Sequence, residues 1–146
     1  MRIIPINSRQ SSFKSYYPLL EEEIYQNFGR MRGESIVKAM SDLAGIAYTD
    51  GSGLDVMIRT IENEDIFKRG INIAVADTKS NMLPDYLMHG NIEKFPHVKG
   101  SIYVKNVPEL DMWSKIVCDT TKTLIDTFKI CREKPYMFEY YNKIFK

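Results

Sequence analysis

The sequence predicts an α/β fold in which helices flank a mixed four-stranded sheet, and three observations carry this prediction. The chain has 146 residues, the usual size of one domain. Apolar side chains recur every three or four positions in several segments, as they do in amphipathic helices. Two further segments, residues 54–61 and 71–76, carry the alternating or continuous apolar pattern of strands. We therefore expect one domain over residues 1–146, with a polar N-terminal arm at 1–14 and an aromatic C-terminal element at 136–146.

The first half of the chain is predicted to contain two helices followed by three strands. Residues 15–28 carry Pro18 near the first turn, three glutamates after it and an apolar stripe, which is typical of a helix. A second helical segment follows Gly33, and Gly45 is expected to end it because glycine is common just past a helix. The three strands that we expect next are adjacent, with the last one central: residues 46–48, 54–61 and 71–76.

The second half is predicted to add two helices and a fourth strand. Pro84 opens a short helix, and residues 101–105 form the strand. Pro108 then begins the strongest helix of the chain, in which apolar residues recur at spacings of three, four or seven until Pro135 stops the pattern. The expected order of elements is α(α)βββαβα.

Composition limits the classes of function. Twenty Lys and Arg residues against nineteen Asp and Glu give a net charge of +1, so any nucleic-acid site must come from a local patch. The sequence lacks the apolar region of a signal peptide and any run of about 18 apolar residues, which favours a cytoplasmic protein without a membrane partner. Cys118 and Cys131 lie too far apart along one predicted helix to pair with each other.

Two aspartates are predicted to meet at neighbouring strand ends. Asp55 begins one strand and Asp77 follows the next, so antiparallel pairing of the two strands brings them side by side. Two close carboxylates repel each other and attract a hard cation, here Mg²⁺ or Mn²⁺. The carbonyl of Thr78 can add a ligand, and Lys79 can orient water or stabilise charge on a phosphate. A polar strand end followed by a turn is the simpler interpretation of residues 77–81.

In these residues the chain resembles the PD-(D/E)XK nuclease superfamily, which has the restriction-endonuclease-like fold. Asp55 matches the first acid of that family, and Asp77 with Lys79 matches its acid-x-Lys triplet. The resemblance implies a restriction-endonuclease-like core and metal-dependent hydrolysis of phosphodiester bonds in DNA or RNA. Asp55, Asp77 and Thr78 would then hold the metal, Asp55, Asp77 and Lys79 would be catalytic, and a homodimer would present two sites to a duplex.

Other polar residues are weaker candidates. Arg30 and Arg32 lie on a glycine-flanked turn and are the first candidates for phosphate contacts, although solvated arginines at a helix end are the simpler interpretation. His89 and His97 have no cysteine or acid at zinc spacing, and His97 is expected in a loop. We therefore expect no zinc site.

The aromatic C-terminal element supports a second class of function. Five aromatic residues lie beside three lysines in residues 134–146, a composition that suits base stacking or a protein interface. An element that covers the core or pairs with a second subunit is the simpler interpretation. The alternative to the nuclease is therefore a non-enzymatic binding or assembly protein, such as a viral or host-interaction factor, that docks a protein partner through this element.

Overall fold

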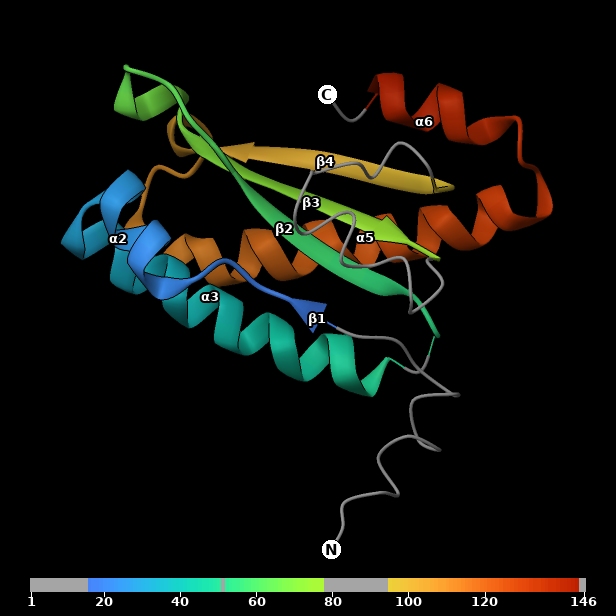
Figure 1. Ribbon diagram of the computed structural model, residues 1–146, viewed down its shortest axis with the longest axis horizontal. Coiled ribbons are helices and arrows are strands. Elements are labelled where there is room, and N and C mark those ends of the chain that lie inside the picture. Colours follow the sequence, from blue (N-terminus) through green and yellow to red (C-terminus); the bar gives the residue numbers. More distant parts are fainter. Residues whose placement is uncertain (1–15, 51, 78–94, 145–146) are drawn as a thin grey trace, which may run out of the picture.

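The computed structural model describes residues 16–50, 52–77 and 95–144. A mixed four-stranded sheet and four α-helices make up this part of the chain, which confirms the predicted α/β class (Figure 1). The elements, in chain order, are β1 (Tyr16–Tyr17), α2 (Glu21–Phe28), α3 (Arg30–Thr49), β2 (Asp55–Ile61), β3 (Gly70–Ala76), β4 (His97–Tyr103), α5 (Trp113–Glu133) and α6 (Met137–Ile144).

The sheet has the strand order β1-β2-β3-β4. Strand β1 pairs parallel with β2, whereas β2 with β3 and β3 with β4 pair antiparallel. The predicted pairing of the two apolar segments is therefore confirmed, and its register runs from Asp55 opposite Ala76 to Ile61 opposite Gly70. Strand β3 lies in the interior of the sheet, as its continuous apolar sequence indicates.

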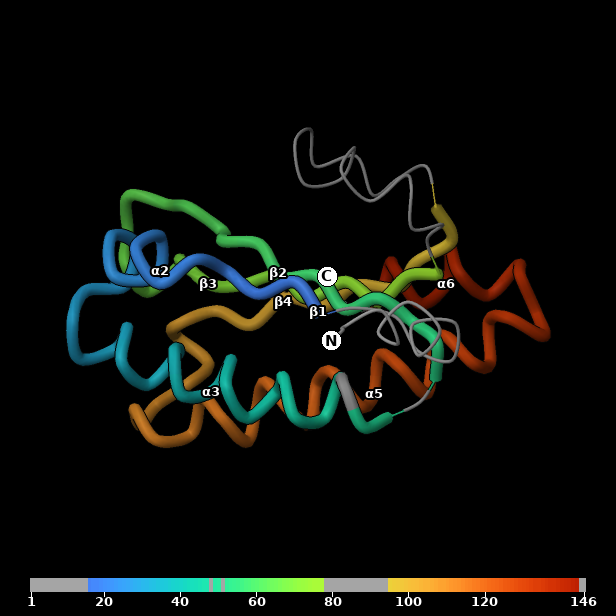
Figure 2. The backbone as a smooth tube through the Cα atoms, turned by 60° about the horizontal axis from the view of Figure 1, so that its bottom comes forward, coloured from blue at the N-terminus to red at the C-terminus, as the bar shows by residue number. Residues whose placement is uncertain are grey.

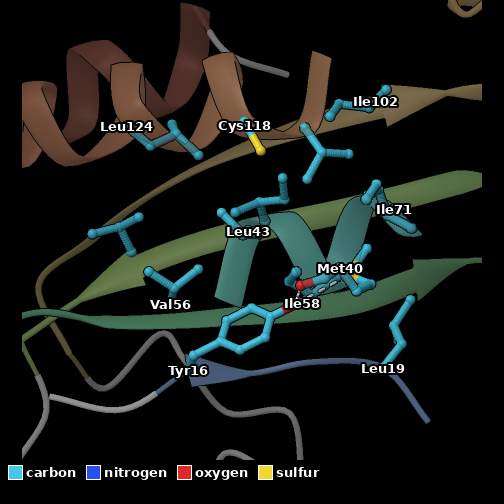
Figure 3. Close-up of a cluster of buried hydrophobic side chains, with 14 of the residues drawn as sticks. Tyr16, Leu19, Met40, Leu43, Val56, Ile58, Ile71, Ile102, Cys118 and Leu124 are labelled. Atoms are coloured by element: carbon cyan, nitrogen blue, oxygen red, sulfur yellow. Dashed lines mark hydrogen bonds between the residues drawn. The ribbon is translucent and has the colours of Figure 1, made fainter. Parts of the chain in front are cut away.

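Helices α3 and α5 lie side by side on one face of the sheet (Figure 2). The main core fills the space between these helices and the sheet, and Figure 3 shows it from within. Val56, Ile58 and Val75 point into this core from the strands. The hydroxyl of Tyr16 donates a hydrogen bond to the carbonyl oxygen of Met40 at 3.1 Å, which fixes β1 against α3.

Three predicted boundaries in the first half of the chain are wrong. The second helix begins at Arg30 rather than after Gly33, so Arg30 and Arg32 lie in its first turn and not in a glycine-flanked turn. Residues 46–48 are not a strand, because α3 continues through Gly45 to Thr49. Gly45 is exposed, and a glycine in an exposed helix interior costs only about 1 kcal/mol, which the packing of Ile46 and Ala47 against the core offsets. The first helix begins at Glu21 rather than at residue 15, because Tyr16–Tyr17 forms a short strand before Pro18.

The second half follows the prediction more closely. The fourth strand is present but spans His97–Tyr103, so it starts four residues before the expected position, and a 3₁₀ turn at Val104–Asn106 replaces its expected end. The strongest predicted helix is α5, but it begins at Trp113 rather than at Pro108, because a 3₁₀ turn at Leu110–Met112 precedes it. The short helix expected from Pro84 lies outside the described residues.

Helix α6 covers part of the free edge of β4. The Asn142 side chain accepts a hydrogen bond from the Lys99 amide at 3.0 Å and donates one to the His97 carbonyl oxygen at 2.9 Å. The Phe138 ring packs edge-on against Phe128 of α5, with 5.2 Å between the ring centroids. Because an unpaired strand edge is a template for pairing with another chain, Asn142 protects this edge as a neighbouring strand would.

Two strand glycines make a matched test of the packing of β3 against β4. A Cβ at Gly70 would overlap the carbonyl oxygen of Ile102 and lie 2.9 Å from the Cα of Tyr103, both backbone atoms that cannot move aside. A Cβ at Gly100 would meet only side-chain carbons, the nearest being Leu124 Cδ2 at 3.7 Å, which is ordinary contact. We expect Gly70→Ala to lower the free energy of unfolding by about 2 kcal/mol. Gly100→Ala should raise it by about 0.5 kcal/mol. Urea unfolding followed by circular dichroism measures both, and equal effects would contradict the register.

Replacing Asn142 tests the cap on β4. Asn142→Ala removes both hydrogen bonds to the strand edge, so we expect a loss of about 1–2 kcal/mol and faster hydrogen exchange of the Lys99 amide. Asn142→Asp is the control, because its carboxylate still accepts from the Lys99 amide while it loses the donor to His97. Unchanged exchange of Lys99 in the alanine variant would show that Asn142 does not cap the edge.

Candidate functional site

The two predicted metal-binding aspartates lie at the same end of the sheet but on opposite faces. Asp55 is 3% exposed and shares the face of its partner Ala76, because directly opposed residues of an antiparallel pair point the same way. Met57 and Ala76 form a small cluster on this face, which points away from the two helices. Asp77 follows Ala76, and its carboxylate accepts a hydrogen bond from Arg132 of α5 at 3.2 Å, on the helical face.

The remaining members of the predicted catalytic set are outside the described part of the chain. Thr78 and Lys79 fall there, so their predicted roles as carbonyl ligand and catalytic lysine stay predictions. Within residues 16–50, 52–77 and 95–144, no three His, Cys, Asp or Glu side chains group so that they could hold a metal ion. The predicted Mg²⁺ or Mn²⁺ site also stays a prediction, and the direction of Asp77 does not support it.

A histidine that sequence reasoning assigned to a loop lies in the same row of the sheet as Asp55. His97 is the first residue of β4 and is opposite Ala76, so Asp55, Ala76 and His97 form one row on the face away from the helices. His97 is 8% exposed, and its Nδ1 lies 2.7 Å from the carbonyl oxygen of Phe95, where it acts as donor. The alternation of Val98, Gly100 and Ile102 with polar residues was the signal that could have placed His97 in a strand.

The two arginines predicted to bind phosphate do not converge. Arg30 and Arg32 are two positions apart in the first turn of α3, so their side chains leave the helix in nearly opposite directions. Arg30 lies 3.5 Å from the carboxylate of Glu34, and its side chain is 90% exposed. The guanidinium of Arg32 instead lies 5.9 Å from the ring centroid of Phe67. A shared phosphate site at these residues stays a prediction without geometric support.

The two cysteines are free and buried. Burial raises the pKa of the Cys118 thiol and of the Cys131 thiol, which disfavours the nucleophilic thiolate. Near Cys118, Ser114 of α5 donates a hydrogen bond to Asp42 of α3, and this bond lowers the pKa of the Asp42 carboxyl, with a smaller contribution from Lys38. This cluster joins the two core helices and does not resemble a catalytic dyad.

The most prominent exposed apolar feature of the C-terminal region lies along α6 and the turn residue just before it. Three side chains at four-residue spacing, which we call the outer stripe, are exposed: Tyr136 by 73%, Tyr140 by 54% and Ile144 by 53%. The opposite side of the helix is held by Phe138 and Asn142. Figure 1 shows α6 beyond β4 at the end of the molecule. The outer stripe therefore belongs to a helix whose other face is already occupied.

One acidic and one basic side chain border the outer stripe. Glu139 and Lys143 are one helical turn apart, with 3.5 Å between the Lys143 ammonium and the Glu139 carboxylate. Both side chains are exposed, by 82% and 72%. At 100° per residue they lie along the same side of the stripe. The outer face of α6 thus combines an apolar surface with one negative and one positive charge.

No family model, no curated protein and no solved structure matches this chain. The resemblance to the PD-(D/E)XK superfamily therefore stays a prediction. Among the described residues, no helix combines the length and the hydropathy required to cross a lipid bilayer.

Proposed function

We propose that the chain is a protein-interaction module that docks a protein partner through the outer stripe of α6. The observation that carries the proposal is the exposure of Tyr140 and Ile144 along one side of α6, and of Tyr136 in the turn just before it. Aromatic side chains are the commonest anchors of protein interfaces, and burying one stabilises a complex by roughly 1–3 kcal/mol. The alternative to a nuclease inferred from the sequence, a non-enzymatic binding or assembly protein, rests on the same C-terminal element.

The contacts that attach α6 to the rest of the domain favour partner binding. A helix of eight residues is only marginally stable by itself, so an isolated α6 would have to order as it bound. Here Asn142 binds the helix to β4, and Phe138 packs it against α5. The helix is therefore already ordered in the free protein, and partner binding does not have to supply the free energy of ordering it. The partner that fits is another helix with an apolar stripe and charges that complement Glu139 and Lys143.

Photo-crosslinking from the outer stripe tests this proposal. A photoreactive phenylalanine analogue at position 140 should give a discrete covalent adduct, whereas the same analogue at Phe67, which is 55% exposed on the β2–β3 connection, should not. Where the adduct is to a different protein, excess unlabelled wild-type chain should suppress it, and a Tyr140→Asp chain should do so at least tenfold less well. Equal labelling from both positions, or equal competition by both chains, would refute docking through α6.

Metal-dependent cleavage of DNA or RNA is the second candidate function. It is supported by the register, because Asp55 opposite Ala76 brings the backbone of Asp55 next to that of Asp77. Two features oppose it: the two carboxylates leave opposite faces of the sheet, and Arg132 already neutralises Asp77. In this proposal Asp55, Asp77 and the carbonyl of Thr78 hold Mg²⁺ or Mn²⁺, and Lys79 acts on the water or the phosphate.

Cleavage assays on single-stranded, duplex and branched DNA and RNA test the second candidate. If Asp77 is a metal ligand, Asp77→Ala and Lys79→Ala should abolish cutting with Mg²⁺ or Mn²⁺. Arg132→Ala should lower the metal concentration needed for half-maximal cutting, because it frees the Asp77 carboxylate. If Asp77 serves only its ion pair, the wild type should cut nothing, and Asp77→Ala should cost less than about 1 kcal/mol because the pair is half exposed.

A further inference from the structure

We infer that the partner of α6 is a second copy of the same chain, bound with the two α6 helices antiparallel around a two-fold axis. The inference rests on the proposed docking function and names its partner. The charges that border the outer stripe carry it. Glu139 and Lys143 are opposite in sign and lie on the same side of the stripe, so the pattern is complementary to its own antiparallel copy.

The spacing of these residues fits one axis. Residues of an α-helix rise about 1.5 Å each, so an axis between Tyr140 and Tyr141 brings Glu139 within about 1.5 Å of the level of the partner's Lys143. The same axis sets Tyr140 against the partner's Tyr140 and turns Tyr136, in the turn just before α6, toward the partner's Ile144. Two reciprocal ion pairs would then border a continuous apolar contact.

Other arrangements of two copies fit less well. A parallel pair would place Glu139 and Lys143 of one copy on the opposite side of the contact from those of the other copy, so that no ion pair would join the two copies. The antiparallel pair brings both sets of charges to the same side of the contact, where Glu139 of each copy attracts Lys143 of the other. The charge pattern therefore selects the orientation as well as the partner.

The expected dimer is weak. An eight-residue helix is about 12 Å long, so the contact falls below the roughly 1,200 Å² buried by stable complexes. Such small contacts are typical of transient association, and the dimer must be sought at protein concentrations of roughly 10 μM to 1 mM. Its weakness makes charge reversal a sensitive test.

Charge reversal at two exposed positions tests the inference by sedimentation equilibrium of the full chain. We expect Glu139→Lys alone, and Lys143→Glu alone, to weaken self-association about tenfold, because each turns both intermolecular pairs into like-charge contacts. The double variant should dimerise within about threefold of the wild type. An equimolar mixture of the two single variants should form a mixed dimer, since its two intermolecular pairs are again opposite in sign.

Several outcomes would overturn the inference. A wild-type chain that stays monomeric up to 1 mM would do so, and so would single variants that associate as well as the wild type. Circular dichroism of each variant checks folding, which substitutions at side chains 82% and 72% exposed should preserve. The crosslink from position 140 separates the two proposals: an adduct to a different protein supports docking without self-association, whereas the absence of any adduct refutes both.

Discussion

The burial of one sheet face against α3 and α5 is the constraint on which the rest of the structure depends. Side chains of a strand alternate between faces, so a residue of β2, β3 or β4 points to the helical face or to the other face according to whether its position along the strand is odd or even. Val56 and Val75 occupy the core, and this alternation directs Asp77 toward α5 and Asp55 away from it. Asp55 cannot change face without moving its whole strand by one residue, which would expose the apolar side chains of that strand, and Asp77, one residue past β3, is held on the helical face by Arg132. The two carboxylates are therefore separated by the same alternation that builds the core.

A sheet with one helical layer must also protect its two edges, and this chain does so by different means. On one side β1 is only two residues long, and Tyr16 fastens it to α3 through Met40. On the other side the amide of Asn142 bonds to the outward carbonyl and N–H groups of β4. A side-chain amide carries one donor and one acceptor, so it can replace one residue of a neighbouring strand without extending the sheet. Helix α6 is thus fixed to the domain by its inner face, and its outer stripe remains exposed.

The elements that could be predicted from the sequence are those with a strong local pattern. Strands β2 and β3 and helix α5 have long apolar periodicities, and the structure matches them closely. Strand β1 is too short to carry a pattern, and it forms only because α3 and β2 supply its contacts. The end of α3 could not be predicted because Gly45 is locally a stop signal, whereas the packing of Ile46 and Ala47 favours helix. Within the candidate site, the proximity of Asp55 and Asp77 was correct at the level of the backbone. Their opposite directions follow from counting alternate residues from Val56 and Val75. The separation of the two carboxylates could therefore also have been predicted from the sequence.

The two candidate functions lie at the same end of the molecule, and α6 connects them. Asp55, Ala76 and His97 form one row at this end, and Asn142 bonds to the carbonyl oxygen of His97. Arg132, near the C-terminal end of α5, holds Asp77 at the same end, only a short turn before α6 begins. A partner bound to the outer stripe would stabilise α6 and with it the Asn142 contacts, so the start of β4 would become more rigid. Binding at α6 would therefore make the backbone at His97 more rigid, even if Asp55 and His97 have only a structural role. The Asp77 side chain points to the helical face, away from Asp55, and α6 is attached to the domain by its inner face with its outer stripe exposed. Both features favour an interaction surface over a metal centre at this end of the sheet.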